Sequence, residues 1–178
     1  AGIETVVAPL GTALTADQAQ LLVRYSKNVY LLYDSDQAGL KATFRAGDEL
    51  LAEGATVRVV TLPEGDDPDT FVQTRGAEAL ERQLRDAIDV FERKVQLLER
   101  GGWFADLTKR RTAVDRLLPT IRVTRDAVMK ELYIARASQA SQVSREVLLR
   151  EADAGAERPP GVRQGSAGGR ASPRREGD

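Results

Sequence analysis

Three short, mostly apolar runs alternate with two helix-like segments in the first part of the chain. The runs cover residues 4–8, 28–33 and 57–62, and each contains β-branched or aromatic side chains, which favour strands. Between them, residues 15–25 and 37–53 carry apolar side chains at helical spacing. The run at 28–33 is almost continuously apolar, which predicts a central strand covered on both faces. This alternation predicts right-handed crossovers and a parallel α/β sheet.

Helical periodicity replaces the strand pattern after residue 70. Three apolar stripes predict helices that pack on one another, and they comprise Val90, Phe91, Val95 and Leu98, then Val114, Leu117, Leu118 and Ile121, then Val128, Met129, Leu132 and Tyr133. Breaks are expected at Gly101 and Gly102, and around Pro119 and Thr124. Residues 144–151 predict a last short helix. From Ala152 onward, Gly, Pro, Ser, Ala and Arg dominate, which predicts a disordered tail.

The composition excludes several kinds of chemistry. The 178 residues include no cysteine and no histidine, which excludes disulfides, zinc sites of thiolate or imidazole ligands, and histidine-dependent triads. No apolar segment approaches the ~20 residues that cross a bilayer, so we expect a soluble, cytoplasmic protein without a membrane partner. The first residue is alanine and the only methionine is Met129, so we expect a lost initiator or a piece of a longer protein.

The net charge of −1 conceals an asymmetry along the chain. Residues 1–71 carry 5 basic and 11 acidic side chains, whereas residues 105–151 carry 10 basic and 6 acidic ones. An acidic first half and a basic helical half suit a carboxylate metal site beside a surface that binds polyanions. Ordinary solvated surface is the alternative interpretation.

Two aspartates follow the second apolar run directly. Asp34 and Asp36 stand at i and i+2 where a strand is expected to end, with α-carbons about 6.5 Å apart. Carboxylates at the carboxyl end of a strand suit Mg²⁺ or Mn²⁺ together with substrate phosphates. The small Ser35 and Gly39 leave room for a phosphate near the start of the next helix. The alternative is that one of these aspartates only caps that helix.

A second acidic loop follows the third apolar run. It contains Asp67 and Asp69, and parallel strands would bring it to the same sheet edge as the first pair. Several carboxylates at one place require compensating cations. The alternative is a polar turn in which Asp69 caps a helix. Gly11 and Thr12, after the first run, are a third and weaker candidate for phosphate binding.

These motifs resemble, in order and spacing, the Toprim domain of bacterial replicative DNA primases of the DnaG type. The matching stretches are LGTALT at 10–15, YDSD with the following Ala38-Gly39, and LP at 62–63 with DPD at 67–69. The similarity is close over residues 1–75 and continues more weakly to residue 151. It implies a partial Toprim-type parallel sheet at 1–75 without its first acidic strand, an all-α helical subdomain at 76–151, and a flexible linker or tail at 152–178.

The resemblance also implies an activity. The family makes short RNA primers on a single-stranded DNA template from ribonucleoside triphosphates, by two-metal nucleotidyl transfer with Mg²⁺ or Mn²⁺. Asp34 and Asp36 match the catalytic metal-binding pair of the family, and Asp67 and Asp69 match further acidic metal positions. Gly11, Thr12 and Gly39 are the residues expected near substrate phosphates.

Parts of the family pattern are missing from this sequence. It contains no Glu-Gly-Tyr-Met-Asp-like motif, whose glutamate the family uses for the first metal, and no zinc-binding domain, basic template-guiding subdomain or helicase-binding domain. We therefore expect an incomplete primase that is weak or inactive alone, with the replicative helicase as partner through a C-terminal domain absent here.

Two alternatives remain. A Toprim-type nuclease or recombination factor would use the same Asp-x-Asp site without ribonucleotides. A non-catalytic helical module would bind DNA or protein independently of metal.

Overall fold

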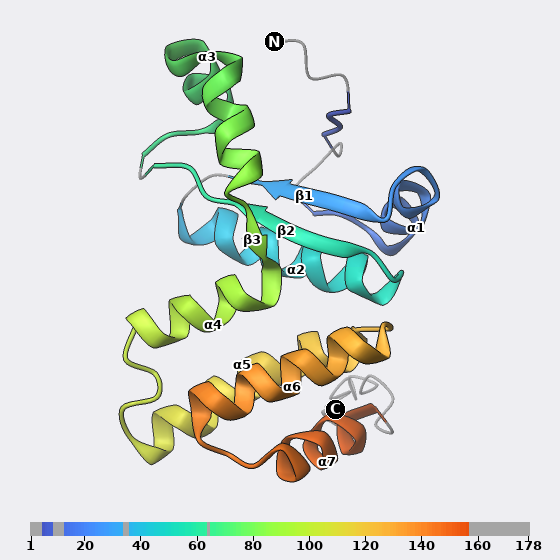
Figure 1. Cartoon of the computed structure of the whole chain (residues 1–178), viewed down its shortest axis with the longest axis vertical. Coiled ribbons are helices and arrows are strands. Elements are labelled where there is room, and N and C mark those ends of the chain that lie inside the picture. Colours follow the sequence, from blue (N-terminus) through green and yellow to red (C-terminus); the bar gives the residue numbers. More distant parts are fainter. Residues whose placement is uncertain (1–4, 9–12, 34–35, 64, 157–178) are drawn as a thin grey trace, which may run out of the picture.

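The computed structural model describes residues 5–8, 13–33, 36–63 and 65–156 (Figure 1). Within them, a small sheet of β1 (Asn28–Leu32), β2 (Thr56–Val60) and β3 (Ile88–Asp89) lies next to a group of helices. The helices are α1 (Ala16–Tyr25), α2 (Gln37–Ala52), α3 (Pro68–Arg85), α4 (Val90–Arg100), α5 (Leu107–Val123), α6 (Ala127–Ser141) and α7 (Arg145–Ala156). No described helix has the combined length and apolar character that a membrane span requires.

The sheet has the strand order β1-β2-β3. The predicted parallel pairing of the first two strands is confirmed, with Asn28 opposite Thr56 and Leu32 opposite Val60. β3 pairs antiparallel with β2 and was not predicted, because two residues are too short to show a strand pattern. The prediction of a central, doubly covered β1 is wrong for the described sheet, since β1 pairs only with β2 there and Tyr30 is 44% exposed.

The strand expected at residues 4–8 is not present in the described part of that segment. Residues 5–8 have no regular structure, and the side chains of Val6 and Val7 are each 68% exposed. Glu4 lies outside the described residues. β-branched side chains favour a strand only where a neighbouring strand supplies hydrogen bonds and a packing surface, and residues 5–8 lack that pairing.

The first helices begin at the residues that the sequence indicates. Thr15 caps α1 through a capping box in which its Oγ1 accepts from the amide of Gln18 at 3.3 Å and the Gln18 side chain accepts from the Thr15 amide at 3.0 Å. α2 ends at Ala52, and Gly54 follows with a φ of 78°, which favours glycine. These short-range signals need no tertiary contact, which is why sequence alone predicts them well.

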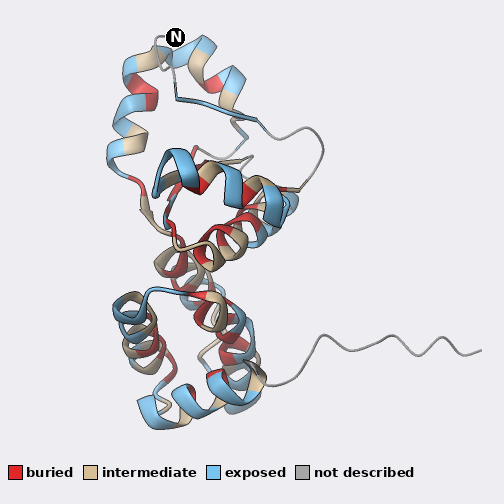
Figure 2. Ribbon diagram, turned by 90° about the vertical axis from the view of Figure 1, so that its right-hand side faces the viewer, coloured by how far each residue is buried: buried red, intermediate tan, exposed pale blue. Residues whose placement is uncertain are grey.

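The helical half of the chain, α4 to α7, confirms two of the three predicted apolar stripes. The stripes of α4 and α5 are buried, but on α6 the side chains of Val128 and Leu132 are 70% and 55% exposed. The prediction holds for Tyr133, which is buried, and for Met129, which packs partly buried against the core. The other buried residues of α6 are Ile134, Ala137 and Ser141, so the buried face is turned slightly around the helix from the predicted one. Figure 2 shows buried residues running along the inner sides of these helices.

Two predicted boundaries change. Pro119 lies inside α5 and does not end it, whereas Thr124 is the C-cap of that helix as expected. α7 continues to Ala156, and Ala152 is 1% exposed, so the predicted start of the tail at Ala152 is wrong for residues 152–156. Burial of Ala152 against its neighbours keeps this last turn helical. Residues 157–178 of the predicted tail lie outside the described residues.

One buried core joins the sheet to the helical half. Its cluster of apolar side chains includes residues of α1, α2, β1 and β2 together with residues of α4 to α7. A second, smaller cluster lies between the end of β2 and α3, and comprises Val60, Leu62, Phe71, Ala79, Leu80 and Ala87. The second half of α2 therefore packs in the first cluster, whereas α3 packs in the second, although both helices follow strands of the same parallel pair.

Candidate functional site

The first candidate region lies between β1 and α2. Asp36 is the N-cap of α2, and its Oδ1 accepts a hydrogen bond from the amide of Gly39 at 2.6 Å. Its side chain is exposed, so it remains accessible from solvent. The capping interpretation is therefore correct for Asp36, and a capping carboxylate still has oxygen lone pairs for a metal. Asp34 lies outside the described residues.

The second candidate region lies between β2 and α3. Asp67 is the N-cap of α3, where its Oδ1 accepts from the amide of Thr70 at 2.8 Å and its Oδ2 accepts from the hydroxyl of Thr70 at 2.9 Å. The backbone hydrogen bond, followed by the hydroxyl, lowers the pKa of the Asp67 carboxyl below its usual value. Asp67 is thus held as a carboxylate in an exposed position.

Asp69 does not cap the helix, contrary to the alternative considered from the sequence. Pro68 occupies the first turn of α3, where its missing N–H is tolerated, so the cap falls on the residue before it. Asp69 lies within the first turn and accepts from Nε2 of Gln73 at 2.7 Å. Asp67 and Asp69 therefore both stand at the amino-terminal end of α3, where the helix dipole favours negative charge.

A residue of α3 compensates the charge of a neighbouring carboxylate in the loop. Oδ2 of Asp66 lies 3.1 Å from an Nη of Arg75, and the guanidinium of Arg75 also lies 5.3 Å from the ring centroid of Phe71. This oxygen is buried and makes no hydrogen bond of good geometry, so its main compensation is the charge of Arg75. Asp66 is therefore less suited than Asp67 to bind a cation.

The described carboxylates do not by themselves form a closed metal site. Among residues 5–8, 13–33, 36–63 and 65–156, no three His, Cys, Asp or Glu side chains gather closely enough to hold an ion. The expected cluster is thus not formed by Asp36, Asp67 and Asp69 alone. Gly11, Thr12 and Asp34 fall outside the described residues, and the Gly39 amide is used in the Asp36 cap.

The donors that are present suit a hard cation. Exposed carboxylate oxygens at Asp36 and Asp67 are the ligands that Mg²⁺ prefers, and Mg²⁺ usually binds through one or two carboxylates plus substrate phosphates and water. Because β1 and β2 are parallel, the loops that carry these two residues leave the same edge of the sheet. The topology therefore supports a shared site at that edge.

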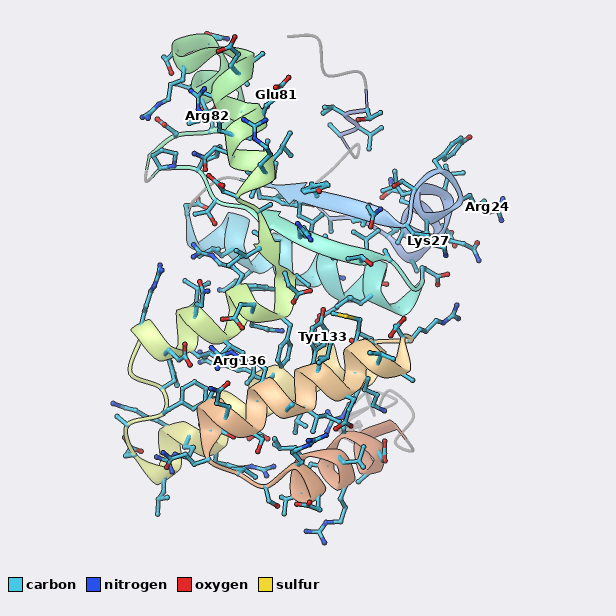
Figure 3. All side chains as sticks on the ribbon, viewed as in Figure 1. Arg24, Lys27, Glu81, Arg82, Tyr133 and Arg136 are labelled. Atoms are coloured by element: carbon cyan, nitrogen blue, oxygen red, sulfur yellow. The ribbon has the colours of Figure 1, made fainter. Side chains whose placement is uncertain are left out.

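Sequence reasoning missed a set of part-buried polar contacts that join α2 and β3 to the helices α4, α5 and α6. The Thr120 hydroxyl of α5 donates to Oδ1 of Asp48 in α2 at 2.7 Å and accepts from Nζ of Lys94 in α4 at 2.8 Å. The Tyr133 hydroxyl of α6 donates to Oδ2 of Asp89 in β3 at 2.8 Å. Figure 3 shows Tyr133 on the side of α6 that faces the sheet. These partners are far apart in sequence, so no spacing pattern signals them.

Burial shifts the ionisation of these groups. It raises the pKa of the Asp89 carboxyl, although hydrogen bonds from Tyr133 and from the first amides of α4 oppose the shift. It also raises the pKa of Tyr133, and the charge of Asp89 adds to that rise. Burial lowers the pKa of Lys94, while the charge of Asp48 opposes the shift. Each group is thus partly desolvated and depends on its named partner.

Comparison with known proteins gives consistent matches. Residues 1–72 match the family described as Toprim-like. The DNA primase of Aquifex aeolicus is 52% identical over 91 residues, which cover 51% of this chain and 18% of the relative. The DNA primase of Halalkalibacterium halodurans is 30% identical over 152 residues, which cover 85% of this chain and 25% of the relative. The chain thus spans about a quarter or less of the length of these curated relatives.

A solved structure matches both halves of the chain. The DnaG primase catalytic domain bound to single-stranded DNA superposes with a TM-score of 0.71 at 30% identity. The match covers 82% of this chain and 47% of that one. Since it extends well beyond residue 72, the helical half shares the fold as well as the Toprim-like part.

Proposed function

The chain belongs to the DnaG-type bacterial DNA primases, and from this membership we propose that it forms part of a catalytic core that synthesises short RNA primers. The proposed substrates are ribonucleoside triphosphates and the proposed template is single-stranded DNA. The observation that carries the proposal is the parallel β1–β2 pair, which leads to Asp36 and Asp67 at one sheet edge in a chain with primase relatives.

In this proposal, Asp34 and Asp36 are the catalytic metal-binding pair, and Asp67 and Asp69 are further acidic ligands. Mg²⁺ or Mn²⁺, when bound, would activate the primer hydroxyl and neutralise the triphosphate. The residues of the chain hold the carboxylates in place. The cap bond to Gly39 orients Asp36, and the two bonds from Thr70 orient Asp67 and keep it ionised.

The proposal extends to domains, partners and location. Residues 1–75 would form the Toprim catalytic core, the helices after them a subdomain of the RNA polymerase domain, and the end of the chain a linker. The replicative helicase would bind through a further C-terminal domain, and the protein would act in the cytoplasm at the replication fork. The relative solved with single-stranded DNA supports the choice of template.

We expect these 178 residues alone to incorporate ribonucleotides poorly. The sequence contains no Glu-Gly-Tyr-Met-Asp-like motif, to which the family resemblance assigns the first metal. Loss of one member of a catalytic unit can remove nearly as much activity as loss of the whole unit. The nuclease, recombination and non-catalytic alternatives are not favoured, because the matching curated relatives and solved structures are primases.

Manganese binding tests the metal site. Mn²⁺ titrated into the chain and followed by water-proton relaxation should show binding that an Asp34→Ala, Asp36→Ala double variant abolishes. Asp17→Ala is the matched control, because Asp17 is also exposed and lies in the first turn of a helix. Equal binding by the double variant and the control would place the metal elsewhere.

Ribonucleotide incorporation tests the activity. A fusion that places the upstream part of the Aquifex aeolicus primase before Ala1 should incorporate labelled ribonucleotides on single-stranded DNA with Mg²⁺ or Mn²⁺. The unfused chain should give much less product, and Asp34→Ala, Asp36→Ala in the fusion should remove the signal. Strong synthesis by the unfused chain would refute the assigned need for the missing motif.

A further inference from the structure

Helix α2 is held near its carboxyl end by two hydrogen bonds that link Asp48, Thr120 and Lys94, a group we call the polar relay. Asp48 accepts from the Thr120 hydroxyl at 2.7 Å, and the same hydroxyl oxygen accepts from Nζ of Lys94 at 2.8 Å. Thr120 is 1% exposed, so this bridge lies inside the protein. The ammonium of Lys94 also lies 5.4 Å from the ring centroid of Phe44 in α2. Three helices, α2, α4 and α5, thus meet at one hydroxyl group.

Close backbone packing supports the same contact. A Cβ atom built on Gly47 would lie 2.8 Å from Cγ2 of Val90, the first residue of α4. α2 and α4 therefore approach each other more closely there than a larger residue would allow. The relay at Asp48 begins at the neighbouring residue of α2. Steric contact and hydrogen bonding together fix this part of α2 against the helical half.

The opposite end of α2 carries the proposed metal ligand. Asp36 caps that end, and at 1.5 Å per residue it lies about 18 Å along the helix axis from Asp48. Because a helix is stiff, a tilt of about 10° at the relay would move its start by about 3 Å. Productive metal and substrate geometry tolerates displacements of only about 0.5 Å. A small tilt of α2 at Asp48 would therefore displace Asp36 by more than a metal site tolerates.

We infer that Asp48, Thr120 and Lys94 are positioning residues, which fix the tilt of α2 and so place Asp36 for metal binding. The inference rests on the proposed function of Asp36, and it assigns the helical half a part in building the metal site. An apolar contact alone would be less specific, because it lets one helix slide or rotate against the other. A hydroxyl that donates to α2 and accepts from α4 fixes both partners in direction as well as distance.

The test compares variants of Thr120 in the whole 178-residue chain. Thr120→Val removes the hydroxyl with little change of volume, and Thr120→Ser restores it. Thr112→Val is the matched control, because Thr112 lies on the same helix and its hydroxyl donates to the carbonyl of Thr108, one turn earlier, and to no other helix in the described part of the chain. The readouts are the Kd for Mn²⁺, the amide hydrogen exchange of Gly39 and Leu40, and the unfolding midpoint in urea.

Thr120→Val should raise the Kd for Mn²⁺ by between about twofold and thirtyfold, the range of coupling through packed networks. It should also speed exchange at Gly39 and Leu40 relative to amides of α1, whereas Thr120→Ser and Thr112→Val should match the parent chain. A Thr120→Val protein that is only less stable, with unchanged Kd and unchanged exchange at α2, would overturn the inference.

Two further variants keep the outcome decisive. If Thr120→Val does not fold, Lys94→Met takes its place, since it keeps an aliphatic chain and the Thr120–Asp48 bond while it removes the third partner. It must produce the same rise in Kd and in exchange, or the inference fails. If Asp36→Asn leaves Mn²⁺ binding unchanged, the proposed metal site fails, and the exchange at α2 alone then decides whether the relay positions the helix.

Discussion

Removal of the Tyr133 hydroxyl tests how strongly its hydrogen bond to Asp89 joins α6 to β3. Tyr133→Phe keeps the ring, which stacks on Phe91 with centroids 4.4 Å apart at 15°. Only the 2.8 Å hydrogen bond to Oδ2 of Asp89 is lost. A hydrogen bond to a charged group contributes about 1.5 to 3 kcal/mol, so we expect a decrease of that size in the free energy of unfolding at pH 7. In a chain of this size the midpoint should fall by roughly 3 to 12 °C.

The pH dependence distinguishes a lost charge-assisted bond from lost packing. Burial raises the pKa of Asp89 in the folded protein above its unfolded value, so folding favours protonation of this carboxyl more than the unfolded chain does. That contribution to stability is complete below the unfolded pKa and is lost as pH rises through the folded pKa. The Tyr133 hydroxyl limits this loss because it stabilises the carboxylate.

Tyr133→Phe should therefore destabilise the protein more at pH 7 than at pH 4. At the lower pH the bond to a neutral carboxyl contributes only about 0.5 to 1.5 kcal/mol. Urea unfolding at both pH values measures the difference, and Tyr25→Phe is the control because that side chain is 84% exposed. An equal loss at pH 4 and pH 7 would refute the assigned role of the Asp89 charge.

Three other variants give separate tests. Gly47→Ala should lower the free energy of unfolding by about 1 to 3 kcal/mol because its Cβ would clash with Val90, and Val90→Ala in the same chain should recover part of the loss in urea titrations. Arg136→Met should destabilise the protein at pH 7 and much less at acid pH. The Arg136 hydrogen bond lowers the pKa of Glu92, so the stability that this bond gives is lost as pH falls through the lowered pKa. Equal destabilisation in thermal melts at both pH values would contradict this role. Asp67→Asn keeps the cap acceptor, so the melting temperature should hardly change while Mn²⁺ affinity falls; unchanged affinity would leave Asp67 with a capping role alone.

The features that sequence predicted correctly are those fixed by a few neighbouring residues. The capping box at Thr15, the helix end before Gly54 and the apolar stripes of α4 and α5 each follow from local hydrogen bonding or a 3.6-residue period. The parallel pairing of β1 and β2 follows because a helix separates two strands. The same alternation indicated a shared edge for the two acidic loops.

The features that sequence missed or placed wrongly depend on partners distant in the chain. A run such as 5–8 has a strand composition, but strand formation needs a neighbour that local sequence does not specify. Val128 and Leu132 fit a helical stripe, yet the packing of α6 against α4, α5 and α7 selects the face with Ile134 and Ala137. Periodicity shows that a face is apolar, whereas the neighbouring helices decide which of two adjacent faces is buried.

The contacts between the two halves of the chain belong wholly to tertiary structure. Asp48 and Thr120 are 72 residues apart, and Asp89 and Tyr133 are 44 apart, so only the folded chain brings them within hydrogen-bonding distance. A buried polar group is stable only with a partner, and no residue spacing states which partner it finds. The sequence alone indicated the residues of the proposed metal site, whereas only the three-dimensional packing brought together the distant groups that contact α2 and β3.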